Sequence, residues 1–143
     1  MQSITTLWLL RVAALVAAAF GILTIRAGGS VLFGDGAATA GNYVPYVVWF
    51  NFAAGFAYVA AAIGLWRARR WGAWAAIAIA GATALVFALF GIHVASGAAF
   101  EMRTVWAMTL RTVLWTGIAA LTFRNTARSP LHRAQAVPET QTR

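Results

Sequence analysis

Long runs of apolar residues divide the chain into four segments. Three of these runs together contain a single Asp, Glu, Lys or Arg side chain, Arg111, and they cover residues 44–66, 72–94 and 104–123. A fourth run, at 7–25, carries Arg11 near its start. Each run is close to the ~20 residues that a helix needs to cross a ~30 Å hydrocarbon layer. The pattern therefore predicts an all-α integral membrane protein, a four-helix bundle.

The expected membrane helices account for most of the chain. We place them at residues 7–25, 44–66, 72–94 and 101–123, which makes residues 1–124 one transmembrane domain. The composition agrees, because 62% of the 143 residues are hydrophobic, against ~45–50% in soluble domains. Residues 125–143 contain Ser129-Pro130 and Pro138 and lack apolar periodicity, so we expect a disordered cytoplasmic tail.

The charge of the chain is positive and unevenly distributed. Eleven basic residues, all arginine, and three acids give a net charge of +8. The arginines stand at the ends of apolar runs and in the tail rather than on a folded basic face, so we expect no nucleic-acid partner. They cluster at Arg67, Arg69 and Arg70 and at Arg124, Arg128 and Arg133. The positive-inside rule then places both termini and the 67–71 loop in the cytoplasm, in an antiparallel bundle.

The two connections on the opposite side differ in length. Residues 27–45 contain Gly28-Gly29, Gly34-Asp35-Gly36 and Gly41-Asn42 around an apolar trio. Glycine permits turns that other residues cannot make, so we expect a loop that either lies on the bundle or covers a site. The connection at 95–99 is short enough to make a helical hairpin of the third and fourth spans.

Small residues recur at four-residue spacing along the third span. They would form one ridge on a helix, made of Gly72, Ala76, Ala80, Ala84 and Ala88. Such a ridge lets two helix backbones approach closely in lipid, where hydrophobic burial no longer drives association. We interpret it as a contact within the chain, with a homo-oligomer seam as the alternative.

Polar residues of the fourth span share one helical face. Alternating spacings of three and four place on it Glu101, Thr104, Met108, Arg111 and Trp115. A buried arginine costs ~2.5–3.5 kcal/mol on insertion scales, so Arg111 is expected to point into the bundle. Asn51 and Tyr58, on the second span, are the acceptors expected near it. In the simplest interpretation, Arg111 and Asn51 lock the helices together through buried hydrogen bonds.

The same arginine supports a second interpretation, a ligand site. Arginine offers a planar fork of donors to oxygen-bearing groups. Arg111, Asn51 and His93 would then hold an anionic or carbonyl-bearing ligand, such as a quinone or a lipid headgroup.

His93 and Glu101 support a third interpretation, an outward-facing metal site. The third span ends at His93 and the fourth begins near Phe100, so the two side chains are expected at the same level. With Met102 or Met108 they would offer ligands to copper or another late transition metal. The alternative is a histidine hydrogen-bonded to the glutamate. Because the chain has no cysteine, thiolate sites and disulfides are excluded, and the sequence identifies no cofactor.

Catalysis is not expected. Glu101 and Asp35 are the only acids before the tail, and no serine–histidine–acid arrangement appears. Haem ligation by two histidines is not expected either, since the second histidine, His132, lies in the expected tail on the opposite side.

The layout of the chain resembles a known group of bacterial membrane proteins. A first span and a glycine-rich outer segment are followed by a span ending in Gly64-Leu65-Trp66, a basic turn, an alanine-rich span ending in Gly91-Ile92-His93, and a fourth span. This order resembles the DoxX-like small four-helix membrane proteins. The resemblance implies a bacterial inner-membrane location and an accessory role in respiratory or redox membrane complexes.

We therefore expect a multi-pass inner-membrane protein that acts as a non-catalytic accessory or ligand-binding subunit. Its expected partners are the lipid bilayer and either a larger membrane complex or further copies of itself. The competing class is a small transporter or carrier for a metal ion or a small anion, with an outward-facing site.

Overall fold

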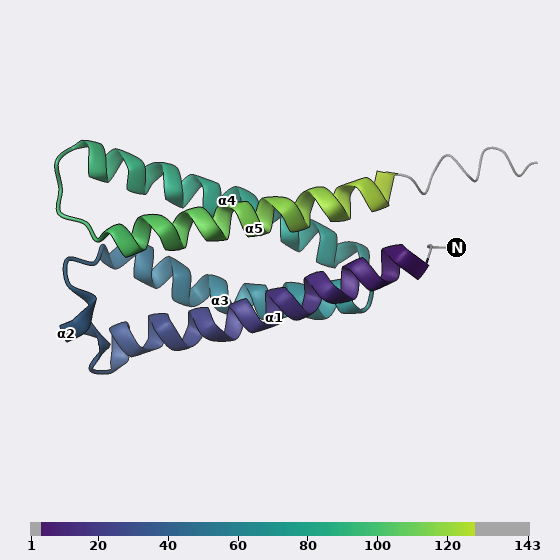
Figure 1. The fold of residues 1–143 in the computed structure, drawn as a ribbon, viewed down its shortest axis with the longest axis horizontal. Helices are drawn as coiled ribbons and strands as arrows, with labels where there is room; N and C mark the ends of the chain where they lie inside the picture. Colours follow the sequence, from purple (N-terminus) through teal and green to yellow (C-terminus); the bar gives the residue numbers. More distant parts are fainter. Residues whose placement is uncertain (1–3, 128–143) are drawn as a thin grey trace, which may run out of the picture.

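The computed structural model describes residues 4–127, with side chains as far as Arg124. This part of the chain forms α1 (Ile4–Phe33), α2 (Gly36–Ala40), α3 (Pro45–Trp66), α4 (Arg70–Ala95) and α5 (Met102–Ala127). All but α2 are long and apolar enough to cross a membrane. The prediction of an all-α chain with four candidate membrane-spanning helices is confirmed (Figure 1).

The four long helices lie side by side along one axis. α1 begins and α5 ends at the same end of the bundle, and α2 lies at the opposite end (Figure 1). The most extensive contact is between α1 and α3. α3 also packs against α4, and α4 against α5, whereas α1 and α5 meet only briefly. The weak contact between α1 and α5 distinguishes that side of the bundle from the other three.

α1 is longer than the predicted first span. The helix continues through Gly28 to Phe33, and residues 36–40 form α2. A Cβ at Gly28 would stand 3.0 Å from the Cβ of Phe52, so this glycine lets α1 and α3 approach closely. The prediction of a loop over 27–45 is wrong for most of this segment, because its first glycines serve helix packing rather than turns.

Small residues also form part of the remaining contact between α1 and α3. Ala13, Ala17 and Gly21 are buried on one face of α1. A Cβ at Gly21 would stand 2.9 Å from the carbonyl oxygen of Gly55. Two helices at this separation gain van der Waals contact that larger side chains would prevent.

The small-residue ridge of α4 is buried over only part of its length. Gly72 and Ala76 are buried, while Ala84 and Ala88 are exposed. At the turn between α3 and α4, a Cβ on Gly72 would stand 2.5 Å from the carbonyl carbon of Gly64. This part of the ridge forms a contact within the chain, as expected. A homo-oligomer through the exposed part stays a prediction.

The buried side chains form two clusters along the bundle. The larger cluster includes Tyr58 and Trp115, whose ring centroids are 4.7 Å apart. The smaller one, toward α2, includes Val47, Phe90 and Met108. Because Arg111 stands between Met108 and Trp115 on α5, it lies where the two apolar clusters meet.

The end of α5 differs from the predicted boundary of the tail. The helix continues to Ala127, past the predicted start of the tail at Asn125. The remainder of the predicted tail, including His132, lies outside the described residues.

Candidate ligand-binding site

A cavity of about 450 Å³ lies between α1, α2, α3 and α5, at the end of the bundle that carries α2. Most of its wall consists of alanine, valine and glycine. Its polar lining consists of Ser30, Thr39, Tyr43, Asn51, Arg103, Thr104 and Arg111. An apolar wall with a few convergent polar groups is typical of small-molecule sites.

Arg111 is the most deeply buried charged group of this lining. The residue is 8% exposed, and its guanidinium carbon lies 5.7 Å from the centroid of the Phe20 ring. Its Nη1 donates to the sulfur of Met108 at 3.7 Å, and its Nε has no hydrogen-bond partner. A thioether is a weak acceptor, so the guanidinium is left with several N–H donors that no strong acceptor among the described residues satisfies.

Other polar atoms around Arg111 are buried without hydrogen bonds. They are Asn51 Oδ1, Tyr58 Oη, Thr83 Oγ1 and Trp115 Nε1. The Tyr58 hydroxyl faces the Thr83 hydroxyl and lies near the Arg111 charge, but neither contact meets the geometry of a hydrogen bond. Arg111 is therefore buried beside Tyr58, as predicted, but the predicted lock of buried hydrogen bonds is not present among the described residues.

The segment around α2 is tied to the start of α5 by two hydrogen bonds. Arg103 Nη2 donates to the carbonyl oxygen of Thr39 at 2.6 Å, and the backbone N–H of Asn42 donates to Glu101 Oε1 at 2.9 Å. Between them, Gly41 has a φ of 63°, a backbone conformation that favours glycine. The start of α5 thereby holds α2 and its flanking residues against the cavity, whose lining includes Thr39 and Arg103.

His93 and Glu101 do not form the predicted pair. The His93 ring stands edge-on to Tyr46, with 6.3 Å between ring centroids, whereas the Glu101 carboxylate turns to Asn42. Glu101 precedes α5 and faces the α2 segment, so similar height along the bundle does not bring it to the end of α4. His93 is likewise not part of the cavity lining, so the predicted site of Arg111, Asn51 and His93 is only partly assembled.

The predicted metal ligands are dispersed among the described residues. Met102 is 59% exposed, while Met108 is fully buried and accepts the hydrogen bond from Arg111. Within residues 4–124, no three His, Asp or Glu side chains gather in a way that suits a metal ion. A positive guanidinium bound to the Met108 sulfur also opposes a second cation there.

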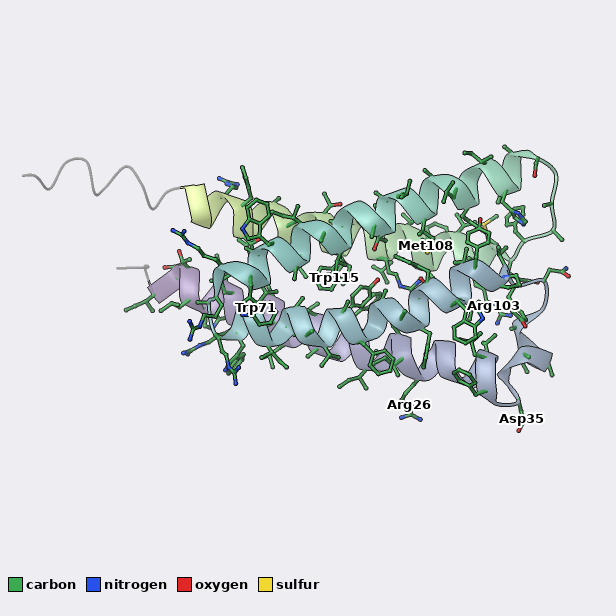
Figure 2. The ribbon with its side chains drawn as sticks, turned by 180° about the vertical axis from the view of Figure 1, so that it is seen from behind. Arg26, Asp35, Trp71, Arg103, Met108 and Trp115 are labelled. Atoms are coloured by element: carbon green, nitrogen blue, oxygen red, sulfur yellow. The ribbon has the colours of Figure 1, made fainter. Side chains whose placement is uncertain are left out.

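The charged side chains of the described cavity lining are both positive. They are Arg103 near α2 and Arg111 at greater depth, and no Asp or Glu belongs to the described lining. Figure 2 shows Arg103 and Asp35 at the same end of the molecule, with Met108 and Trp115 farther along α5 and Arg26 projecting away from the bundle. Two positive charges in an apolar cavity attract anions and repel cations.

Sequence reasoning overlooked three contributors to this region. Thr83 is the only hydroxyl side chain in α4, and that isolation was a usable signal. The positions of Thr39 and Arg103 were harder to predict from the sequence, since they depend on α2 folding back over the bundle.

Comparison of the chain with protein-family models, with curated proteins and with solved structures gives no match. The function is therefore argued from the geometry of the cavity.

Proposed function

We propose that this chain is a non-catalytic protein of the bacterial inner membrane that binds an anionic ligand in the cavity lined by Arg111. The observation that carries the proposal is that Arg111 lines the cavity while its buried guanidinium has, among the described residues, only the Met108 sulfur as an acceptor. An isolated charge in an apolar interior is costly unless it is paired. A ligand carboxylate or phosphate supplies that pairing.

An anion fits this cavity better than a neutral carbonyl. A quinone oxygen would accept hydrogen bonds from Arg111 but would leave its charge uncompensated, together with that of Arg103. A carboxylate or phosphate accepts the planar guanidinium fork and neutralises the charge at the same time. The shared requirement is an oxyanion, whether it belongs to a free solute or to a headgroup.

The proposed orientation is an antiparallel bundle with both termini in the cytoplasm. The arginine-rich turn at 67–70 supports it, because basic residues are retained on the cytoplasmic side. The cavity lies at the opposite end, near α2. In this orientation the anion enters from the outer side of the membrane.

The biological role that we propose is that of an accessory subunit. The resemblance in layout to DoxX-like proteins supports a place in a respiratory or redox membrane complex. Purification in mild detergent followed by mass spectrometry tests this role. A stoichiometric protein partner supports it, and a chain that repeatedly purifies alone contradicts it.

A carrier for a small anion is the second candidate. It is favoured by the α2 segment, which two hydrogen bonds hold at the cavity and which would have to move for a ligand to pass. Uptake of labelled phosphate or butyrate into proteoliposomes separates the two roles. Transport that needs Arg111 favours the carrier, and binding without transport favours the subunit.

Thermal unfolding of the purified chain in neutral detergent tests anion binding. Inorganic phosphate or butyrate should raise the unfolding temperature at constant ionic strength, since a ligand at about 100 times its Kd contributes ~2.7 kcal/mol. Arg111→Gln should abolish the effect. Arg26→Gln removes an exposed arginine that projects away from the bundle and should retain it. Equal responses of the two variants would contradict the proposal.

A further inference from the structure

A groove lies on the outside of the α1–α3 pair, toward the α3–α4 turn. We propose that this groove binds one anionic glycerophospholipid, with an acyl chain along the groove and the phosphate at Arg11 and Arg67. The proposal uses none of the residues of the Arg111 cavity and stands or falls without it.

The groove has a volume of about 340 Å³ and two apolar walls. Ala14, Leu15 and Ala18 of α1 form one wall, and Val59 and Ile63 lie on the α3 wall. Leu15 is 60% exposed and Ile63 is 46% exposed. Because α1 and α3 are candidate spans, these side chains face hydrocarbon, and an acyl chain is the apolar material available to fill the groove.

Both walls lead to an arginine at the same end. On α1, Arg11 precedes Ala14, Leu15 and Ala18 by three, four and seven residues, so it continues the same helical face. Trp66, the last residue of α3, and Arg67, which follows it, close the other wall. The two ends meet, because the Arg11 guanidinium carbon lies 5.7 Å from the centroid of the Trp66 ring.

Within residues 4–124, these arginines have no acidic partner nearby. In the part of the chain with described side chains, the acids are Asp35 and Glu101. Asp35 precedes α2, and Glu101 binds Asn42, so both belong to the opposite end of the bundle. Figure 2 shows nitrogen-tipped side chains gathered at the end that carries Trp71. Among the residues with described side chains, the end of the groove is therefore cationic, with no acid to compensate it.

The charge of this end selects an anionic lipid over a zwitterionic one. Guanidinium groups bind phosphate oxygens through paired, charge-assisted hydrogen bonds. A choline or ethanolamine headgroup would bring its own cation beside Arg11 and Arg67, whereas a glycerol headgroup would not. The chemistry fits phosphatidylglycerol or a related anionic lipid, with the headgroup at the arginine-rich interface.

Native mass spectrometry of the full chain, titrated in neutral detergent with dioleoylphosphatidylglycerol or dioleoylphosphatidylcholine, tests the site. We expect one tightly held phosphatidylglycerol and weaker phosphatidylcholine binding. Arg11→Gln and Arg67→Gln should each weaken the first phosphatidylglycerol about fivefold, as expected for one basic residue at an anionic membrane surface. Arg67→Lys should recover part of that loss, because charge remains while the fork is lost.

Two matched controls distinguish this groove from diffuse attraction. Arg70→Gln removes an exposed arginine of the same turn that is outside the groove lining, and it should leave the first lipid in place. Ala18→Leu fills the groove and should weaken both lipids, while Ala19→Leu, at an exposed position outside the lining, should not. Equal binding of the two lipids, or equal losses in Arg67→Gln and Arg70→Gln, would overturn the proposal.

Discussion

Glu101 accepts a hydrogen bond from the backbone N–H of Asn42 across 59 positions of sequence, at an N to O distance of 2.9 Å. The Glu101 carboxylate also lies directly against Gly41. The contact joins the residue before α5 to the segment after α2, and through it to one wall of the cavity. A change at either residue should therefore act on the cavity as well as on the fold.

Gly41→Ala should destabilise the protein more than Gly97→Ala. Both glycines have positive φ, 63° and 79°, so each substitution costs ~1–3 kcal/mol of backbone strain. A Cβ at Gly41 would collide with the Glu101 carboxylate, while one at Gly97 would meet no described atom within 4 Å. Thermal unfolding in detergent measures the difference, which should shrink when Gly41→Ala is combined with Glu101→Ala. Equal effects at the two glycines would contradict the contact.

Gly72→Ala should loosen the junction of α3 and α4. A Cβ there would stand 2.5 Å from the Gly64 carbonyl carbon, and overpacking of this kind costs ~1–3 kcal/mol. Gly81→Ala, on the same helix, would meet no described atom within 4 Å and should be neutral or slightly stabilising because alanine favours helix. The unfolding temperatures of Gly72→Ala and Gly81→Ala, each compared with the parent protein, test this difference. An unchanged temperature for Gly72→Ala would contradict close packing at this turn.

The spans were predictable because charge is costly in hydrocarbon, which makes its absence a strong signal over residues 44–66 and 72–94. The end of the first span was not predictable, since Gly28 is compatible with a turn as well as with close helix packing. Only the position of Phe52 on the neighbouring helix decides between them. A single sequence carries no information about that neighbour.

The burial of Arg111 followed from helical spacing and from the cost of facing lipid. The partners of Glu101 and His93 could not be predicted in this way. Spacing along a helix gives the level of a residue along the bundle, but not which neighbouring segment the side chain contacts when a loop lies between. Glu101 turned to Asn42 and His93 to Tyr46. Predicting these contacts requires knowing that α2 folds back toward the start of α5.

Tyr58→Phe should cost little stability, in contrast to Tyr58→Ala. The Tyr58 ring is fully buried and lies 4.7 Å from the Trp115 ring, but its hydroxyl, which faces Thr83, meets the geometry of a hydrogen bond with no described residue. Removing an unsatisfied buried hydroxyl is nearly neutral or stabilising, while truncating a buried aromatic ring costs ~3–5 kcal/mol. The unfolding temperatures of Tyr58→Phe and Tyr58→Ala in detergent measure this difference. A large loss in Tyr58→Phe would show that the hydroxyl is satisfied in the membrane.

The proposed topology predicts opposite results for two reporter fusions. A reporter that is active only in the periplasm should be active when inserted at Gly36 and silent when fused after Ala127. The expectation rests on the arginines of the 67–70 turn and on Arg124, which favour the cytoplasmic side. Activity at Ala127 with silence at Gly36 would invert the bundle and move the cavity to the cytoplasmic side.

Arg111→Met should stabilise the ligand-free protein while removing its response to anions. The guanidinium is 8% exposed and its hydrogen bond is to the Met108 sulfur, so an apolar side chain of similar length relieves an uncompensated charge. The gain should be about 2 kcal/mol, below the ~2.5–3.5 kcal/mol insertion cost of a central arginine. Arg111→Lys retains the charge and should show no such gain. A lower unfolding temperature for Arg111→Met than for the parent protein, with no anion present, would contradict this prediction. The arginine would then stabilise the contact between helices, and its burial would no longer support an anionic ligand in the cavity.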